Sequence, residues 1–328
     1  MSFRANRLPA LLLAASAFVF GSVADARAQA VEKLTIVIFS PPSLGALLPP
    51  VIKAEKFDLA NGLDITFAER PPDAYVTQFN SGEFKVGGSA SLTTLGLADV
   101  RGVKVKYLFN LFDYWGTIVT SRDNVKTLKD LEGKELAGAR STTNYQMSEF
   151  FEKKQGVDVS KIKVVNTAPP GLISYAIADR ADAIQIWEPA YTLMMTKKPS
   201  IRTIDLNIAK TWKEFGGGTI PYLGVGAHSD WADANPDKVQ KLYTIYKAAV
   251  EWVQKNPDQA APLLAKGAPP EELKAVAAMI RSNERLAMKL TKAGEVRKDI
   301  EAVYKAGMEI NYLPSMPSGA SIYDKPLK

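Results

Sequence analysis

Hydroxyl and amide side chains gather at a predicted helix start near the middle of the chain. The run 141–145 follows a predicted strand at 135–139 and precedes an amphipathic segment, 147–151. Free backbone N–H groups and hydroxyls at such a helix start form a cradle for an anionic group. A simple capping box with Glu149 is the alternative, and both can hold together. The candidate ligand contacts here are Thr142, Thr143, Asn144 and Tyr145.

A run of small residues at 88–92 is interpreted as a second helix start of the same kind. Glycine and serine let a ligand come close to the backbone, which makes Ser89, Ala90 and Ser91 candidate contacts. Structural capping alone is the alternative interpretation. Ser40 and Ser43, which flank two prolines after the first predicted strand, are weaker candidates.

Trp187, Glu188 and Pro189 end a predicted strand, and ligands of open α/β sheets gather at strand ends. Trp187 offers a wall for a ligand, and Glu188 offers an acceptor for an ammonium or amide group. A core tryptophan with a carboxylate at the rim is the alternative. Further aromatic wall is expected from Tyr114, Trp115, Tyr145 and Tyr222.

The residue types of the chain give little support for a catalytic site or a metal site. His228 is the single histidine, and its neighbours Ser229 and Asp230 point in other directions from a strand end, so they cannot form a triad. With no cysteine and one histidine, only carboxylate-type metal sites remain, and no EF-hand loop is present. The glycine runs lack the spacing of phosphate-binding motifs. The sequence therefore predicts neither a catalytic site, a metal site nor a cofactor.

The N-terminus has the pattern of an export signal. Arg4 and Arg7 precede an apolar stretch, 8–23, that is shorter than the roughly 20 residues of a membrane-spanning helix. Two Ala-x-Ala sites follow at 26–28 and 28–30. Residues 1–30 are therefore predicted to be a signal peptide, with an uncleaved anchor as the alternative, and the mature chain is expected to begin near Val31.

The composition limits where the protein can be located and what it can bind. The chain has no cysteine, so neither a disulfide framework nor a lipid anchor at the cleavage site is possible. The expected location is a periplasm. Removal of residues 1–30 lowers the net charge from +6 to about +4, and the lysines are spread over many helical faces, which disfavours nucleic-acid binding.

Short apolar runs alternate with helical patterns, which is typical of an α/β fold with mainly parallel sheets. Four helices are predicted in the C-terminal third, and the first three begin at Asn235-Pro236, Asn256-Pro257 and Pro269-Pro270, with the fourth after Gly294. Residues 113–116 and 216–221 are interpreted as passages between two lobes, although the second also fits a surface loop. The predicted strands are residues 34–40, 63–69, 103–109, 116–121, 162–168, 181–187 and 221–227.

Four blocks resemble the periplasmic binding proteins of nitrate, taurine, alkanesulfonate and thiamine-precursor ABC importers. Lys85 departs from the pattern where an aspartate is common, and Phe57-Asp58 replaces a glycine and an aromatic residue. The blocks are 81–103 (SGEFKVGGSASLTTLGLADVRGV), 126–134 (KTLKDLEGK), 179–191 (DRADAIQIWEPAY) and 230–256 (DWADANPDKVQKLYTIYKAAVEWVQKN).

The resemblance implies a two-lobed, type II periplasmic-binding-protein fold. Lobe 1 would consist of residues 31–115 and 222–328 and lobe 2 of residues 116–221, with the ligand in a cleft between them. In this family the position of Ser89, Ala90 and Ser91 contributes ligand contacts. The lobes close on the ligand like a hinge, and an inner-membrane ABC permease recognises the closed form.

The expected function is capture of a small organic anion, such as a sulfonate or carboxylate, by a monomer that makes or breaks no bond. Thiamine-pyrimidine synthases share the fold and are enzymes, but they depend on a histidine and, in the eukaryotic type, a cysteine-rich motif, and they stay inside the cell. A periplasmic sensor that presents its ligand to a membrane receptor is a third interpretation, which the sequence does not separate from transport.

Overall fold

The computed structural model describes Met1 and residues 31–328, and the latter form one compact unit. The predicted signal peptide therefore lies almost wholly outside the described residues. Two sheets organise this unit. The six-stranded sheet has the order β11-β4-β10-β3-β1-β2 and consists of β1 (Glu32–Phe39), β2 (Leu63–Arg70), β3 (Val86–Ser91), β4 (Val105–Asp113), β10 (Pro221–His228) and β11 (Met288–Lys292). The five-stranded sheet has the order β7-β6-β8-β5-β9 and consists of β5 (Thr117–Thr120), β6 (Glu135–Gly138), β7 (Lys163–Asn166), β8 (Ala183–Ile186) and β9 (Arg202–Ile204).

Both sheets are mixed, so the expectation of mainly parallel sheets was wrong. β1 pairs in parallel with β2 and β3, and β6 pairs in parallel with β7 and β8. The strand that follows each passage between the sheets runs the other way: β10 is antiparallel to β3 and β4, and β5 is antiparallel to β8 and β9. The chain enters β5 and β10 from the other sheet, at the edge where the parallel strands of the new sheet end. These two strands therefore run in the opposite direction to the parallel strands.

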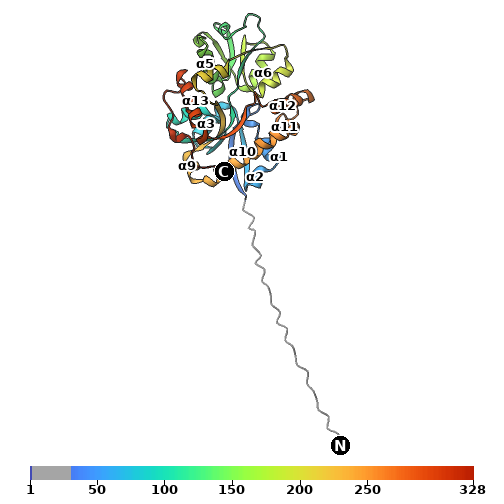
Figure 1. Cartoon of the computed structure of the whole chain (residues 1–328). Coiled ribbons are helices and arrows are strands. Elements are labelled where there is room, and N and C mark those ends of the chain that lie inside the picture. Colours follow the sequence, from blue (N-terminus) through green and yellow to red (C-terminus); the bar gives the residue numbers. More distant parts are fainter. Residues whose placement is uncertain (2–30) are drawn as a thin grey trace. The chain divides into compact units, whose positions relative to one another are not determined.

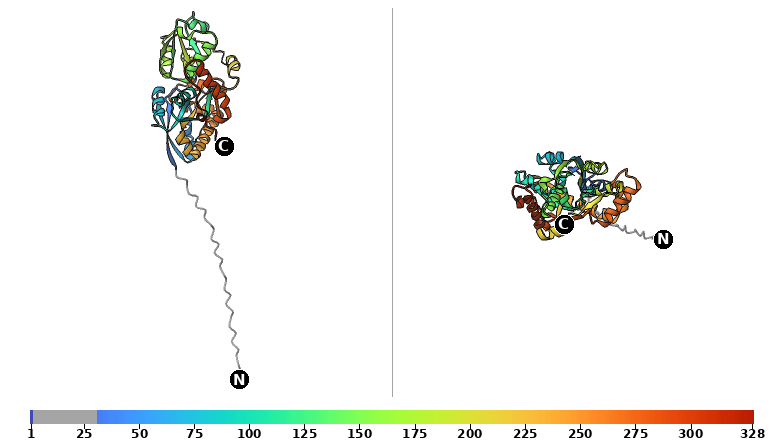
Figure 2. Two further views of the ribbon diagram at one scale, coloured as in Figure 1. Left: turned by 90° about the vertical axis from the view of Figure 1, so that its left-hand side faces the viewer. Right: turned by 90° about the horizontal axis from the view of Figure 1, so that it is seen from above.

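The helices divide between the two sheets (Figure 1; Figure 2). Helices α5 and α6 lie with the five-stranded sheet, in the upper part of Figure 1, and the long helix α10 lies with α1 and α2 beside the six-stranded sheet. Around the six-stranded sheet are α1 (Pro49–Ala54), α2 (Phe57–Ala60), α3 (Pro72–Asn80), α4 (Leu92–Val100), α9 (Ser229–Ala234), α10 (Pro236–Lys255), α11 (Pro257–Leu264), α12 (Pro270–Ser282) and α13 (Arg297–Glu309). With the five-stranded sheet are α5 (Thr143–Lys154), α6 (Pro169–Ile177), α7 (Ala190–Lys197) and α8 (Ile208–Phe215). Single 3₁₀ turns are η1 (Leu44–Ala46), η2 (Leu128–Leu131), η3 (Val159–Lys161), η4 (Ala293–Val296) and η5 (Gly319–Ser321).

The part with the six-stranded sheet is called lobe 1 below, and the part with the five-stranded sheet lobe 2. The chain passes from β4 to β5 through 114–116 and returns to β10 through 205–220. The two passages are joined, because the Tyr114 N–H donates to the Ile220 carbonyl at 2.7 Å. The glycines of the return passage differ: a Cβ on Gly218 would stand 1.9 Å from an oxygen of Asp299 in α13, whereas Gly217 has open space around it and a φ of +77°. The positive φ favours glycine at 217, and the close approach favours it at 218.

All seven predicted strands and the strand at 135–139 are present, with ends within a few residues. The four C-terminal helices are also confirmed as α10 to α13. One assignment was wrong: residues 88–91 belong to strand β3, and α4 begins only at Leu92.

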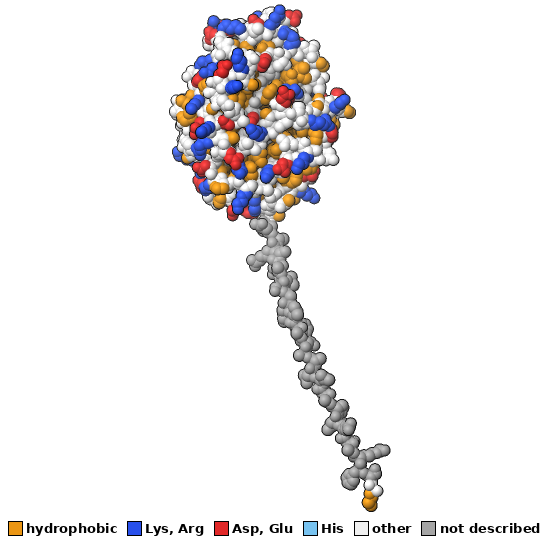
Figure 3. Space-filling model, viewed as in Figure 1, with side chains coloured by type: hydrophobic (Ala, Val, Ile, Leu, Met, Phe, Trp, Pro, Cys, Tyr) orange, Lys and Arg blue, Asp and Glu red, His pale blue; other side chains and the backbone are white. Residues whose placement is uncertain are grey.

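The surface carries both signs of charge. Lys and Arg side chains alternate with Asp and Glu over the face seen in Figure 3, with apolar side chains between them. None of the helices in the described part of the chain has the length and apolar character needed to span a bilayer.

Candidate functional site

The starts of α4 and α5 meet at the boundary between the lobes. The Thr143 hydroxyl hydrogen-bonds to the hydroxyls of Ser91 and, at 2.6 Å, Thr93, and the Thr143 N–H donates to the Ser91 hydroxyl at 3.2 Å. The Thr93 N–H also donates to the Thr143 hydroxyl at 3.2 Å, and the Thr93 hydroxyl donates to Gln146. All four side chains are buried. The two predicted runs are thus brought together, and in this closed arrangement their hydroxyls bond to each other.

The remaining residues of the two runs have structural partners. The Ser89 hydroxyl accepts the Phe39 N–H at 2.8 Å and closes the end of β1. Ala90 is buried and pairs with Gly224 of β10. Thr142 is the N-cap of α5, and its hydroxyl accepts the Tyr145 N–H at 3.2 Å. The predicted capping is therefore present, with Tyr145 and not Glu149 on the partner side.

A second buried polar group lies where the chain passes between the lobes. The Asn144 amide donates to the Trp115 carbonyl at 3.0 Å and accepts the Gln185 amide at 2.5 Å. Tyr114 meets Tyr222 edge to face, with ring centroids 6.1 Å apart, and it stacks on Phe151. The Tyr114 hydroxyl and the Gln185 carbonyl oxygen have no hydrogen-bond partner among the described residues. These side chains fasten α5 to the passage.

The two other predicted aromatic contacts lie within the packed interior. Trp187 is 4 % exposed and belongs to the hydrophobic core. The ring of Tyr145 packs against Gly138, where a Cβ would stand 2.7 Å from a ring carbon. Their proposed roles as ligand contacts stay predictions.

Glu188 has partners in both lobes. Its carboxylate accepts the Thr192 hydroxyl at 2.9 Å and the Thr192 N–H at 3.0 Å, both within lobe 2. From lobe 1, the Arg285 Nε donates to the same carboxylate at 2.8 Å. Arg285 also lies over the rings of Trp115 and Tyr191, 5.9 and 5.3 Å from their centroids. The acceptor expected for a ligand is engaged in a cross-lobe ion pair.

A cavity of about 730 Å³ lies between the lobes next to this ion pair. The strand-end segments 41–43 after β1 and Pro189 after β8 form part of its wall. α7 contributes Leu193 and Lys197 from lobe 2, and 263–279 closes the other side from lobe 1. The lining is mainly Pro, Leu, Ala, Val and Met, with Ser43 and four charged side chains among them. This volume is within the range of small-molecule sites.

None of the twelve residues predicted as ligand contacts lines this cavity, whereas the weaker candidate Ser43 does. Sequence reasoning missed the wall from α7, α11 and α12, because its apolar residues follow ordinary helical spacing. It also missed Arg285, Thr93 and Gln146. Besides Ser43, there was one indirect signal in the sequence: Pro189, which follows the predicted contacts Trp187 and Glu188, lines the cavity.

Two carboxyl groups near the passages have raised pKa values. Burial raises the pKa of Glu152, on α5, to about 7, although the Ser148 hydroxyl donates to it at 2.8 Å. Burial also raises the pKa of Asp113, at the end of β4, to about 6, opposed by Lys289 and by a hydrogen bond from Asn110. Both groups lose hydration in the fold, which favours the neutral acid.

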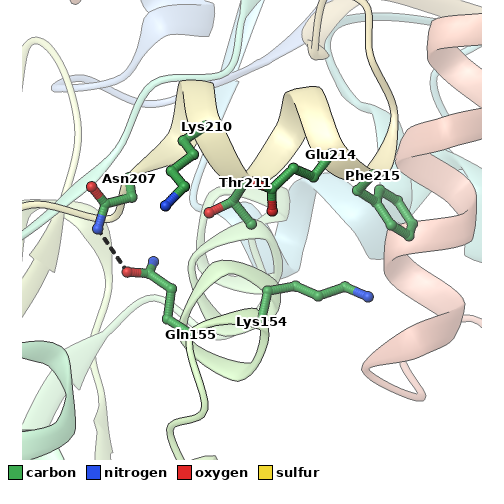
Figure 4. Close-up of a pocket in the computed structure, with 7 residues that line it drawn as sticks. All are labelled: Lys154, Gln155, Asn207, Lys210, Thr211, Glu214 and Phe215. Atoms are coloured by element: carbon green, nitrogen blue, oxygen red, sulfur yellow. Dashed lines mark hydrogen bonds between the residues drawn. The ribbon is translucent and has the colours of Figure 1, made fainter.

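A smaller recess of about 390 Å³ lies wholly within lobe 2, between α5 and α8 (Figure 4). Three of its polar side chains are paired: the Asn207 amide donates to Gln155 at 2.8 Å, and Lys154 pairs with Glu309 of α13. His228 lines neither the cavity nor this recess, and its Nε2 is hydrogen-bonded to the Phe79 carbonyl at 2.6 Å. No group of three His, Cys, Asp or Glu side chains in residues 31–328 is placed to hold a metal ion.

The model of the family described as "NMT1/THI5 like" matches residues 58–260. The chain belongs to this NMT1/THI5 like family. Among curated relatives, a Brucella abortus (strain 2308) protein named as a binding protein is 22% identical over 148 residues, which are 45% of this chain and 45% of the relative. A Bacillus subtilis (strain 168) protein named for aliphatic sulfonates is 22% identical over 45% of this chain and 42% of its own. The match thus spans about half the length of these relatives.

Solved structures of periplasmic binding proteins share the fold of this family member over most of the chain. The alkanesulfonate-binding protein SsuA of Xanthomonas axonopodis pv. citri, bound to MOPS, gives a TM-score of 0.71 at 18% identity and covers 90% of this chain and 99% of its own. SsuA of Escherichia coli gives 0.68 at 17% identity, with 87% and 95% covered. The nitrate-binding protein NrtA of Synechocystis PCC 6803 gives 0.66 at 12% identity, with 87% and 83% covered. The two-lobed type II periplasmic-binding-protein fold is therefore confirmed.

Proposed function

We propose that this chain is the solute-binding component of an ABC-type importer and captures a small organic anion. The observation that carries the proposal is the cavity of about 730 Å³ between two lobes of a periplasmic-binding-protein fold. Its wall includes the segments that follow β1 and β8, which is where α/β sheets bind ligands. A mainly apolar lining favours an organic body over a bare inorganic ion.

The finer parts of this proposal follow from the same function. Cleavage near Val31 would release a monomer into the periplasm, where it would deliver its ligand to a permease in the inner membrane. Lobe 1 would extend over 31–115 and 222–328 and lobe 2 over 116–221, with movement at 113–116 and 216–221. Capture requires no bond to be made or broken, which agrees with the placement of the single histidine away from the cavity.

Ligand screening against a cavity variant tests the function. Native mass spectrometry of freshly purified protein should reveal a bound small molecule, and a panel of sulfonates and carboxylates should raise the melting temperature of the wild type. Ala268→Trp, which fills the cavity, should abolish that rise. Ala60→Trp, at an exposed position on α2 that does not line the cavity, is the matched control and should preserve it.

Two results would contradict the proposal. One is a panel in which no anion stabilises the wild type and no molecule co-purifies. The other is product formation from a bound compound, which would make the chain an enzyme.

A further inference from the structure

Helices α7 and α12 meet at the boundary between the lobes, with an ion pair at each end. Glu188, just before α7, pairs with Arg285, just after α12. Lys197, the last residue of α7, pairs with Glu272 in the first turn of α12 at 3.3 Å. In the first pair the carboxylate comes from the α7 side and the cation from the α12 side, and in the second pair this is reversed. Each acidic group lies at a helix start, where the helix dipole favours negative charge.

The two ion pairs differ in their surroundings. The Glu188 side chain is 1% exposed and its partner Arg285 is 37% exposed, whereas Lys197 is 47% exposed and Glu272 13% exposed. An exposed pair contributes little because water screens it. A desolvated carboxylate is costly without an opposite charge, and among residues 31–328 Arg285 is the cation within salt-bridge distance of Glu188. The Glu188–Arg285 pair therefore dominates this contact.

Arg285 also reaches the passage between the lobes. Its guanidinium lies over Trp115, which belongs to the passage, and over Tyr191 of α7. Those two rings meet edge to face with centroids 5.2 Å apart. Stacking a guanidinium on aromatic rings adds attraction and fixes its orientation. One side chain of lobe 1 thus contacts both lobe 2 and the passage.

The same helices form opposing walls of the cavity. Leu193 and Lys197 come from α7, and Glu272, Val276 and Met279 come from α12. If α7 moves away from α12, the two walls separate and the cavity opens. This separation also breaks the Glu188–Arg285 pair.

We infer that Arg285 is a positioning residue that holds the closed form of the cavity by pairing with Glu188 across the lobes. The inference rests on the proposed function and adds the residue pair that sets how long the cavity stays closed. Glu188 then acts on the ligand through closure and does not need to contact it.

Distances between two spin labels in the ligand-free protein test whether the Glu188–Arg285 pair stabilises the closed form. The chain has no cysteine, so Ser200→Cys in lobe 2 and Lys274→Cys in α12, both exposed, give one label on each side of the contact. Pulsed electron resonance of the otherwise wild-type protein should show a short-distance population, which corresponds to the closed form with the Glu188–Arg285 pair. Arg285→Gln should move protein from this population to longer distances and raise the ratio of open to closed form roughly tenfold or more. Arg281→Gln is the matched control, because Arg281 lies in the last turn of α12, four residues before Arg285, and pairs with Asp258 within lobe 1.

Coupling distinguishes a pair from two separate effects. Glu188→Gln should open the protein as Arg285→Gln does, and the double variant should open it no further than either single change. Arg285→Lys, which keeps the charge, should open it less and serves if a single variant fails to fold. Distance distributions that match Arg281→Gln, or fully additive effects, would overturn the inference. No ligand is used, so a failure here leaves the uptake proposal untouched, and a failed ligand panel leaves this result standing.

Discussion

Glu152 is a carboxyl group that the fold prefers to keep neutral. It is 3 % exposed, and the neighbouring groups that act on it are Ser148, which donates a hydrogen bond, and Glu149, which repels its negative charge. Burial raises its pKa from 4.5 to about 7. Stability from the neutral form is therefore fully present below the unfolded pKa and is lost as the pH rises through about 7.

We expect Glu152→Gln to flatten the dependence of stability on pH. The wild type should lose on the order of 3 kcal/mol between pH 4.5 and 8 from this group, and the variant should not. Gln keeps an acceptor for Ser148 and removes the titrating proton. Asp113, with its pKa raised to about 6, adds a loss of the same sign to both proteins. Urea unfolding across this pH range measures the difference, and parallel curves would show that Glu152 is hydrated.

At the scale of elements, the starts of α4 and α5 depend on a single hydroxyl. The Thr143 hydroxyl accepts the Thr93 N–H and bonds to two further hydroxyls. Thr143→Val should leave the buried Thr93 N–H without its partner and remove one hydrogen bond each from the Ser91 and Thr93 hydroxyls. This change should cost about 1–3 kcal/mol, or the lobes should part so that water replaces the lost hydroxyl. Thr196→Val is the control, because that hydroxyl bonds only to Leu193 in its own helix.

Hydrogen exchange separates the two outcomes of this change. The amides of Thr93 and Thr143 should exchange faster in Thr143→Val than in the control, either with a lower urea midpoint or with an unchanged one if the lobes part. Unaltered exchange at both amides would mean that the contact between the helices does not need the hydroxyl.

Most elements were predictable because each carries its own periodicity or cap. β3 was not, since its residues VGGSAS have the composition of a loop or helix start. It forms a strand because it pairs with β1 and β10. Its glycines are explained by close packing, since Cβ atoms on Gly87 and Gly88 would stand 2.2 and 2.8 Å from the hydroxyls of Tyr75 and Tyr246. β9 and β11 were missed because they are short and are defined by their partners β5 and β4.

The candidate site was predictable only in part. The hydroxyl runs do meet at the lobe boundary, as strand ends and helix starts suggested. The cavity wall from α11 and α12 was not predictable, because it depends on how the C-terminal helices dock across α7, and their apolar residues look like any core stripe. Arg285 gave no signal, since its partner Glu188 lies 97 positions away in the chain.

At the scale of the whole molecule, export should lower the mass of the chain by the mass of its signal peptide. Expressed with its own N-terminus in a Gram-negative host, the protein recovered from the periplasm should begin at Gln29 or Val31, after one of the two Ala-x-Ala sites. Intact-mass spectrometry measures this directly. A full-length chain in the membrane fraction would contradict the proposed location.

The position of β10 sets an order for the folding of the newly made chain. β10 lies between β3 and β4, and its Val225 pairs with Phe109, which precedes it by more than a hundred positions. All strands of the five-stranded sheet precede β10 in the chain, so that sheet can assemble while β3 lacks its neighbour β10 and β4 lacks both of its neighbours, β10 and β11. Pairings over such distances form slowly. A chain interrupted before Pro221 therefore keeps one finished sheet, exposes the edge of β3 and leaves β4 without a sheet partner, which makes it a target for chaperones, proteases and aggregation.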